Sequence, residues 1–287
     1  MKRTIPAGYL VSRTATRGPD DGLGEWTVRV GDHVLDPACP LVIAGPCAVE
    51  SREQTLAIAR EVRAAGGDML RGGAYKPRTN PYSFQGLGEE GLDILAEAKA
   101  ETGLPVVTEV MDPRLVEKVG AVADVLQVGS RSMQNFPLLR EVGRFGKPVL
   151  LKRGYAADLE EWLSAAEYVA REGNRNILLC ERGIRTFASG AYSRNTLDLA
   201  VLAAVREVSW LPVLVDPSHA TGDWRRVPAA CSAALAHGAH GLLIDVVANA
   251  EGRRTARCDG GQGILPSQLR RIIREARGEP RLRALRP

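Results

Sequence analysis

One short stretch of this chain combines three cationic side chains with two adjacent glycines. Arg71 and Lys76 lie where an apolar run gives way to a loop, and Arg78 follows a proline that restricts the backbone. Gly72 and Gly73 let a ligand or another backbone segment approach closely. Guanidinium and ammonium groups that converge in this way bind phosphate or carboxylate. The stretch therefore predicts an anionic substrate, and the alternative is a solvated basic loop.

Four residues far apart in the sequence carry donor atoms that metal ions bind. They are Cys47, His219, Asp245 and Asp259, and each lies on or shortly after an apolar run. Sulfur, imidazole and carboxylate donors together suit a borderline divalent ion such as manganese, iron, cobalt or zinc, and they do not choose among these metals. The alternative is that each residue is structural, as a small buried thiol, a hydrogen-bonded imidazole and two loop-capping carboxylates.

A second group of cations follows three consecutive apolar runs. It consists of Arg131, Lys152 and Arg182, and Ser130 adds a polar group beside the first of them. Cations placed together repel one another unless an anion joins them, and a ligand with both phosphate and carboxylate would satisfy all three. The alternative is that the cations pair with carboxylates nearby in the sequence, at Glu109, Glu141 and Glu181.

The elements that must position these residues alternate between two kinds. Eight nearly continuous apolar runs are typical of buried parallel strands, at 41–46, 68–74, 105–110, 125–130, 148–153, 176–182, 212–219 and 241–247. Amphipathic stretches between them predict helices outside a sheet, including 51–65, 88–102, 159–172 and 196–208. This alternation predicts an α/β fold, a (β/α)8 TIM barrel with its site at the carboxyl ends of the strands. An open doubly wound sheet is the alternative, which the lack of a GxGxxG turn disfavours.

The sequence predicts one barrel domain with short extensions. Residues 1–38 do not fit the repeat, because 17–24 is rich in turn residues and 26–34 predicts a small hairpin that closes the bottom of the barrel. We assign 39–278 to the catalytic barrel. The tail at 279–287 is rich in arginine and proline, so we expect it to fray or to contact another subunit of a homo-oligomer.

Composition argues against several classes of protein. Of 287 residues, 45% are hydrophobic and 25% are charged, with no apolar run that could span a bilayer and no signal peptide, so we expect a cytoplasmic protein without membrane contact. The net charge of +4 comes from dispersed arginines and only 5% of residues are aromatic, which gives little support for nucleic-acid binding. Five cysteines without CxxC spacing argue against a disulfide framework.

Several ordered motifs resemble the 3-deoxy-7-phosphoheptulonate (DAHP) synthases, in their short microbial type I subgroup, which is related to the 3-deoxy-octulosonate 8-phosphate (KDO8P) synthases. The motifs are AGPCAVES at 44–51, KPRT at 76–79, TEV at 108–110, QVGSR at 127–131, KRG at 152–154, CERGIRT at 180–186 and DPSHA at 216–220. The KPRT loop resembles the heptulosonate enzymes rather than the octulosonate enzymes. The resemblance spans nearly everything beyond residue 40.

The resemblance implies a metal-dependent condensation of phosphoenolpyruvate with erythrose 4-phosphate, which gives 3-deoxy-7-phosphoheptulonate and phosphate and opens the shikimate pathway. The residues that it implies for phosphoenolpyruvate are Arg71, Lys76, Arg131, Lys152 and Arg182, and Ser130 is a further candidate for substrate binding. Arg78 and Thr79 would meet the phosphate of the aldose. The ion on Cys47, His219, Asp245 and Asp259 would polarise the aldehyde carbonyl. Lys76 is the candidate proton donor to the aldehyde oxygen, and a purely electrostatic contact is its alternative.

Two departures from the family pattern fall near the end of the chain. Asp245-Val-Val247 stands where the family usually has Glu-Val-His, and Cys258-Asp-Gly-Gly-Gln-Gly263 stands where it typically has Ser-Asp-Gly-Pro-Gln-Ser. The acid is one methylene shorter, so the metal or the backbone must move. These departures keep two alternatives open: a specialised-metabolism paralogue with another aldose acceptor, and a catalytically silent barrel that binds an anion. With only a short hairpin before the first strand, we expect no dedicated domain that senses aromatic amino acids.

Overall fold

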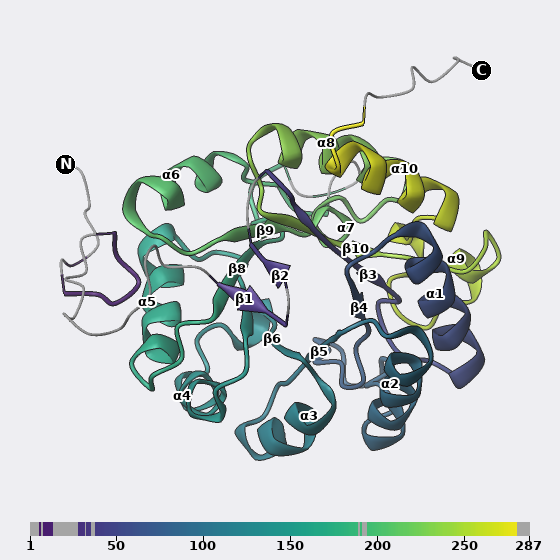
Figure 1. Cartoon of the computed structure of the whole chain (residues 1–287), viewed down its shortest axis with the longest axis horizontal. Helices are drawn as coiled ribbons and strands as arrows, with labels where there is room; N and C mark the ends of the chain where they lie inside the picture. Colours follow the sequence, from purple (N-terminus) through teal and green to yellow (C-terminus); the bar gives the residue numbers. More distant parts are fainter. Residues whose placement is uncertain are drawn as a thin grey trace.

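A closed barrel of eight parallel strands forms the centre of the computed structural model (Figure 1). The structure describes residues 6, 8–13, 28–31, 33–35, 38–188, 190 and 194–279. The barrel strands are β3 (Leu41–Gly45), β4 (Met69–Arg71), β5 (Val106–Glu109), β6 (Val125–Val128), β7 (Val149–Lys152), β8 (Ile177–Glu181), β9 (Val213–Val215) and β10 (Gly241–Asp245). The last strand pairs in parallel with the first, from Gly241 opposite Leu41 to Asp245 opposite Gly45. This closure confirms the predicted (β/α)8 barrel and rules out the open sheet.

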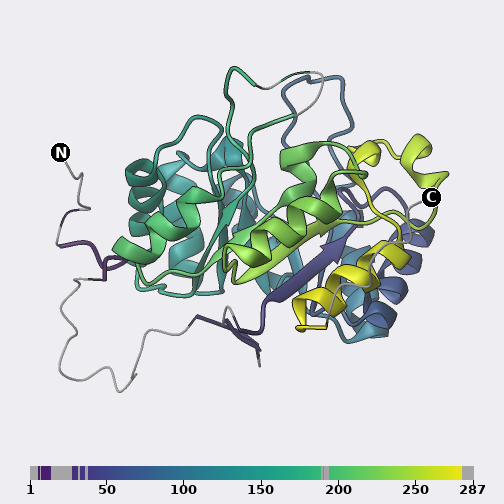
Figure 2. The ribbon, with the colours of Figure 1, turned by 90° about the horizontal axis from the view of Figure 1, so that it is seen from above.

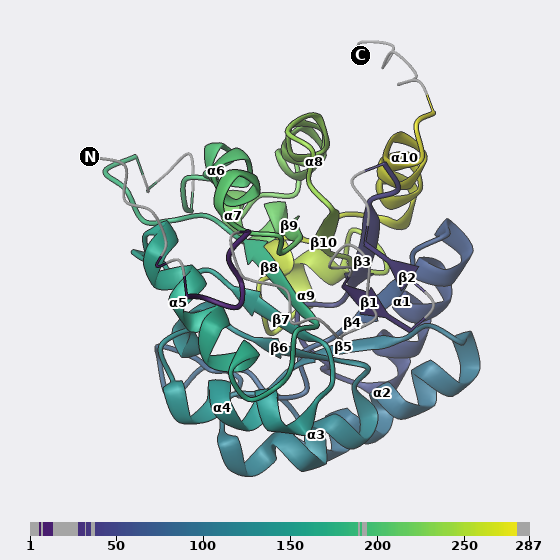
Figure 3. The same cartoon turned by 60° about the vertical axis from the view of Figure 1, so that its left-hand side comes forward.

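Helices follow the strands and cover the outside of the barrel (Figures 1 and 3). The α-helices of the described residues are α1 (Arg52–Ala65), α2 (Glu89–Thr102), α3 (Val116–Val122), α4 (Phe136–Phe145), α5 (Leu159–Ala170), α6 (Ala200–Val208), α7 (Pro217–Thr221), α8 (Val227–Ala236), α9 (Gly252–Thr255) and α10 (Pro266–Ala276). Short 3-10 turns are η1 (Pro113–Leu115), η2 (Ser130–Ser132) and η3 (Gly260–Gln262). None of the helices described combines the length and the hydrophobicity that crossing a bilayer requires.

Local chemistry sets the ends of the predicted helices. Helix α1 begins where the Ser51 hydroxyl accepts a hydrogen bond from the Gln54 backbone N–H at 3.1 Å, and it ends at Gly66 in the left-handed region. The predicted helix 196–208 begins later, at Ala200, because Thr196 is drawn into an isolated bridge with Ile184. Most of the strands are also shorter than the apolar runs that predicted them, since the last residues of several runs leave the sheet to build the loops above it.

The inside of the barrel is filled with apolar side chains. Ile43, Met69, Val107, Leu150 and Leu243 belong to one buried cluster, so the barrel is a packed core and not a channel. The nearly continuous apolar strands therefore face helices on one side and this cluster on the other. A packed interior leaves the ends of the barrel as the places where polar side chains gather.

The amino-terminal hairpin lies at the bottom of the barrel. Strands β1 (Arg29–Val30) and β2 (His33–Val34) pair antiparallel, and the Val28 and Val30 side chains belong to the cluster inside the barrel. Figure 2 shows this hairpin at the end of the barrel away from the long loops. The residues at 17–24 and 280–287, and 26–27 and 32 of the predicted hairpin, lie outside the described residues. The domain boundaries at 39 and 278 stay predictions.

Candidate active site

One pocket lies at the carboxyl ends of the barrel strands. The sequence-predicted residues that line it are Arg71, Lys76, Arg78, Ser130, Arg131, Lys152, Arg182, His219 and Asp259. Cys47 and Asp245 line an adjoining cavity that shares Asp259 with the pocket. Thr79 is joined to the pocket by Arg131, whose Nε and Nη2 donate to the Thr79 hydroxyl at 3.3 and 3.2 Å. The structure thus brings both predicted groups of residues to one end of the barrel, as parallel strands require.

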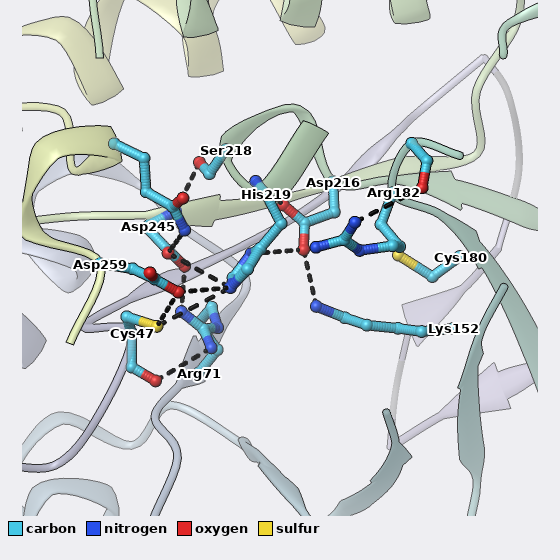
Figure 4. Close-up of polar contacts among 12 residues, drawn as sticks. Cys47, Arg71, Lys152, Cys180, Arg182, Asp216, Ser218, His219, Asp245 and Asp259 are labelled. Atoms are coloured by element: carbon cyan, nitrogen blue, oxygen red, sulfur yellow. Dashed lines mark hydrogen bonds and ion pairs between the residues drawn. The ribbon is translucent and has the colours of Figure 1, made fainter. Parts of the chain in front are cut away.

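The predicted metal ligands meet in a buried cluster (Figure 4). Cys47 Sγ lies 3.7 Å from His219 Nε2 and 3.7 Å from Asp259 Oδ2. His219 Nε2 lies 3.7 Å from Asp259 Oδ2 and 3.8 Å from Asp245 Oδ2. Donor atoms with these separations can reach a common ion at the ~2.0–2.3 Å that nitrogen, oxygen and sulfur ligands take to zinc. The residues present therefore fit the divalent ion that the sequence predicts.

The Asp216 carboxylate lies beside the imidazole of His219. His219 Nδ1 lies 2.8 Å from Asp216 Oδ2, and the His219 backbone N–H donates to Asp216 Oδ1 at 2.9 Å. Burial alone would lower the pKa of His219, but the carboxylates of Asp216 and Asp245 outweigh it and raise that pKa above its usual value. This contact leaves Nε2 as the nitrogen that faces the cluster, which is the arrangement of a metal-binding histidine.

Asp245 is shared between the cluster and a cation. Its Oδ1 accepts a hydrogen bond from Arg71 Nη1, and its Oδ2 accepts one from Gln262 Nε2 at 2.5 Å. Both side chains of the Arg71–Asp245 pair are 3% exposed. Burial opposes the charge of Arg71, but Asp245 and Cys47 outweigh it and raise the Arg71 pKa. The acid that departs from the family pattern thus neutralises a predicted substrate-binding arginine.

Two thiols lie side by side at the cluster. Cys47 Sγ is 3.4 Å from Cys258 Sγ, and Arg78 Nη1 donates to Cys258 Sγ at 2.6 Å. The hydrogen bond between the sulfurs, with burial, raises the pKa of Cys47 well above its usual value. The same bond, helped by Lys76 and Arg78 against the effect of burial, lowers the pKa of Cys258 to about 7. Of the two thiols, Cys258 is therefore the easier to ionise.

Lys76 and Asp259 stay charged beside these thiols. Lys76 Nζ donates to the Cys47 carbonyl at 3.1 Å and to Cys47 Sγ at 3.3 Å. Burial opposes its charge, but the sulfurs of Cys47 and Cys258 outweigh burial and raise the Lys76 pKa. Burial would likewise raise the pKa of Asp259, but His219 and the cations around it lower that pKa to about 2. The cluster combines a cationic donor with an ionised carboxylate.

The second cationic group has one carboxylate partner. Lys152 Nζ donates to Asp216 Oδ2 at 2.6 Å. Arg131 and Arg182 instead lie over the Tyr155 ring, at 5.5 and 4.7 Å from its centroid. The Ser130 hydroxyl is buried and has no hydrogen-bond partner within the part of the chain that the structure describes. Two guanidinium groups and one orphaned hydroxyl therefore face a pocket that has room for an anion.

The carboxylates proposed as alternative partners go elsewhere. Glu181 pairs with Arg153 at 3.1 Å, and Glu141 lies 3.8 Å from Arg144. Glu109 lines the pocket and accepts a hydrogen bond from Gln127 Nε2 at 3.3 Å. A Cβ on Gly129 would lie 2.0 Å from Glu109 Oε1, so the close approach of this carboxylate requires glycine at that position. The alternative ion pairs that the sequence suggested, between these glutamates and Arg131, Lys152 or Arg182, do not form among the described residues.

Sequence reasoning missed several residues of this site. Tyr155 and Arg194 line the pocket, and Arg194 Nη1 lies 3.2 Å from Asp259 Oδ1. Tyr155 lies shortly after β7 but is uncharged, so it did not stand out among the polar residues at the strand ends, and Arg194 lies in the loop between β8 and α6, far in sequence from either strand end. Cys258 was noted as a departure but not as a site residue, because sulfur contact depends on how the loop after β10 folds. Asp216 was noted within the DPSHA motif but was not predicted as a site residue, although its position directly after β9 was a signal for it.

Comparison with known proteins places this geometry in a family. Residues 35–278 match the profile described as the DAHP synthetase I family. The phospho-2-dehydro-3-deoxyheptonate aldolase of Thermotoga maritima is 45% identical over 273 residues, which is 95% of this chain and 78% of that protein. The 2-dehydro-3-deoxyphosphooctonate aldolase of Syntrophotalea carbinolica is 33% identical over 268 residues, or 87% of this chain and 94% of that protein.

Solved structures agree with the sequence comparison. The crystal structure of the Thermotoga maritima DAHP synthase has a TM-score of 0.82 and 43% identity, and the match covers 88% of this chain and 72% of that one. A truncated form of the 3-deoxy-D-arabino-heptulosonate 7-phosphate synthase from the same organism has a TM-score of 0.81 and 39% identity, over 94% of this chain and 95% of that one. This chain therefore belongs to the DAHP synthetase I family.

Proposed function

We propose that this protein condenses phosphoenolpyruvate with erythrose 4-phosphate to give 3-deoxy-7-phosphoheptulonate and phosphate. The observation that carries the proposal is one pocket in which Arg131 and Arg182, without carboxylate partners among the described residues, lie near a cluster of metal-ligand type. Family membership supports the same reaction. The proposal includes a cytoplasmic location and a homo-oligomeric state, which rest on the sequence and on the resemblance alone.

The cationic group is suited to phosphoenolpyruvate. Its carboxylate and phosphate need several charge-assisted hydrogen bonds, which Arg131, Lys152 and Arg182 supply from three neighbouring strand ends. The Ser130 hydroxyl, which has no partner among the described residues, is placed to add a further contact to the phosphate. Because these groups sit on the ends of packed strands, they hold the reacting carbon in a fixed orientation. Arg78 and Thr79, on the loop after β4, are placed for the phosphate of the aldose.

The cluster of Cys47, His219, Asp245 and Asp259 would hold the divalent ion, which when bound supplies a Lewis acid for the aldehyde carbonyl. Lys76 lies next to this cluster as a buried ammonium, so it is placed to give a proton to the aldehyde oxygen while C3 of phosphoenolpyruvate forms the new bond. Its contact with the Cys47 sulfur also fits the electrostatic alternative.

The same pocket offers a group for the second half of the reaction. Bond formation at C3 leaves positive charge at C2, where water adds before phosphate leaves. Glu109 faces the pocket close to Gly129, so its carboxylate is placed to balance this charge and to hold the attacking water. The cations around the phosphate stabilise the oxygens as the phosphate group departs.

The test is product analysis with several acceptors. Purified, metal-loaded protein is incubated with phosphoenolpyruvate and, separately, with erythrose 4-phosphate and other aldose phosphates of four to six carbons, and both phosphate release and product mass are measured. We expect a seven-carbon product from erythrose 4-phosphate at the highest rate. A preferred different acceptor would identify the specialised paralogue, and tight phosphoenolpyruvate binding without phosphate release from any acceptor would identify the silent barrel.

A further inference from the structure

The two departures from the family pattern meet at the same point in space. Asp245 Oδ2 lies 3.8 Å from His219 Nε2, and Cys258 Sγ lies 3.4 Å from Cys47 Sγ. Asp245 belongs to a group of potential ligands with Cys47 and His219, and Cys258 belongs to one with Cys47 and Asp259, so the two groups share the Cys47 sulfur. Both departures therefore fall on side chains that could reach an ion held by Cys47.

The shorter acid is committed to other partners. Both oxygens of Asp245 accept hydrogen bonds, from Arg71 and from Gln262. The arginine is as deeply buried as the acid, and among the described residues its other side-chain hydrogen bond goes to the Cys47 carbonyl at 3.2 Å. Drawing the carboxylate onto an ion would leave a buried guanidinium without its counter-charge, which is costly. Asp245 is therefore better suited to hold Arg71 than to bind an ion.

The Cys258 sulfur lies beside the Cys47 sulfur, where it could replace Asp245 as a ligand of the ion. Its side chain is buried, and Glu50 fixes its loop by accepting the Cys258 and Arg257 backbone N–H groups at 3.0 Å each. Two thiolates bound to one tetrahedral ion at ~2.3 Å lie about 3.8 Å apart. The observed separation of the Cys47 and Cys258 sulfurs is 3.4 Å, close to this value. Arg78 and Lys76 approach the two sulfurs with cations, which favours thiolates.

We propose that Cys258 is a second thiolate ligand of the ion, together with Cys47, His219 and Asp259, and that Asp245 lies outside the coordination sphere as the partner of Arg71. This inference deepens the proposed function and rests on it for the presence of the ion. A set of two sulfurs, one imidazole and one carboxylate selects zinc or iron over harder ions such as manganese or magnesium. The site thereby differs in chemistry from one with a single sulfur and two carboxylates.

The test is X-ray absorption at the zinc edge of the zinc-loaded full-length protein, which counts sulfur neighbours near 2.3 Å. We expect two sulfurs per zinc in the wild type and one in Cys258→Ser, with zinc affinity reduced. Cys39→Ser is the matched control, because this thiol is exposed and remote from the cluster, so two sulfurs should remain. Asp245→Asn should keep both sulfurs, because Asp245 lies outside the coordination sphere and asparagine has nearly the same shape.

Each outcome bears on the inference. One sulfur per zinc in the wild type overturns it, even if the Cys258→Ser variant does not fold. Retention of two sulfurs in Cys258→Ser, or failure of the protein to bind zinc, also overturns it. Heptulosonate formation is measured on the same preparations, so one sulfur with turnover refutes only the second thiolate ligand. Two sulfurs without turnover on any acceptor would instead count against the proposed reaction.

Discussion

Removing the acid from the buried Arg71–Asp245 pair should destabilise the metal-free protein. Both side chains are 3% exposed, so Asp245→Ala leaves a guanidinium in the protein interior without its counter-charge. Breaking a buried pair in this way costs about 3–5 kcal/mol. At roughly 2–4 °C per kcal/mol for a domain of this size, the melting temperature should fall by about 6–20 °C.

The assay is thermal unfolding followed by circular dichroism, in the presence of a chelator so that metal binding does not contribute. A matched control is Glu97→Ala, which breaks the exposed Arg52–Glu97 pair, with side chains 56% and 40% exposed. Exposed pairs contribute about 0–1 kcal/mol, so this variant should melt close to the wild type. The double variant Arg71→Met, Asp245→Leu should recover part of the loss, because it removes both charges.

If Asp245→Ala melts within the range of Glu97→Ala, the reasoning about this pair is wrong. That result would mean that water reaches Arg71, or that the carboxylate has no role in holding the arginine. It would also mean that pairing with Arg71 does not prevent Asp245 from binding the divalent ion.

Three further perturbations test other parts of the site. Zinc affinity, measured by competition with a chromophoric chelator, should rise with pH across the raised pKa of metal-free His219 and rise further as the Cys47 and Cys258 thiols ionise, because a protonated imidazole or thiol cannot bind the ion. By linkage, the stability that charged His219 contributes is present at low pH and is lost as pH rises through that pKa. Asp216→Asn should lower this pKa and move the rise in affinity to lower pH, and an unchanged pH profile would contradict the role of Asp216. Arg182→Met should reduce kcat/KM for phosphoenolpyruvate by about 10–100-fold, because one hydrogen bond to a charged group is lost. The melting temperature should change little, and a large loss of stability with normal kcat/KM would indicate a structural role. Cys47→Ala should lose bound metal and turnover together, as metal analysis and phosphate release would reveal, whereas loss of stability alone would mark a structural thiol.

The strands were predictable from the sequence because burial on both faces leaves little choice of residue type. The centres of the runs at 176–182 and 241–247, residues 177–180 and 241–244, carry no polar side chain, and these runs became β8 and β10. The placement of Lys152 and Asp245 at one end of the barrel then followed from parallel strand direction. The fold, and the gathering of these side chains at one end of the barrel, were therefore accessible before any contact was known.

The partners within the site were not predictable, because contacts between loops depend on three-dimensional paths. Lys152 pairs with Asp216 from a strand two positions away, where sequence proximity had suggested a glutamate. Tyr155 lies under two guanidinium groups from different strand ends, although nothing in its own segment marks it. The contact between Cys47 and Cys258 spans 211 residues and depends on the loop after β10.

The central claim is that the cationic pocket and the thiol–imidazole–carboxylate cluster form one site. A crystal structure of the protein with zinc and phosphoenolpyruvate, with anomalous data at the zinc edge, tests it directly. We predict zinc between Cys47 and His219, and the phosphate and carboxylate of phosphoenolpyruvate on Arg131, Lys152 and Arg182 in the same cavity. Zinc bound elsewhere, or phosphoenolpyruvate bound away from these three cations, would contradict the account.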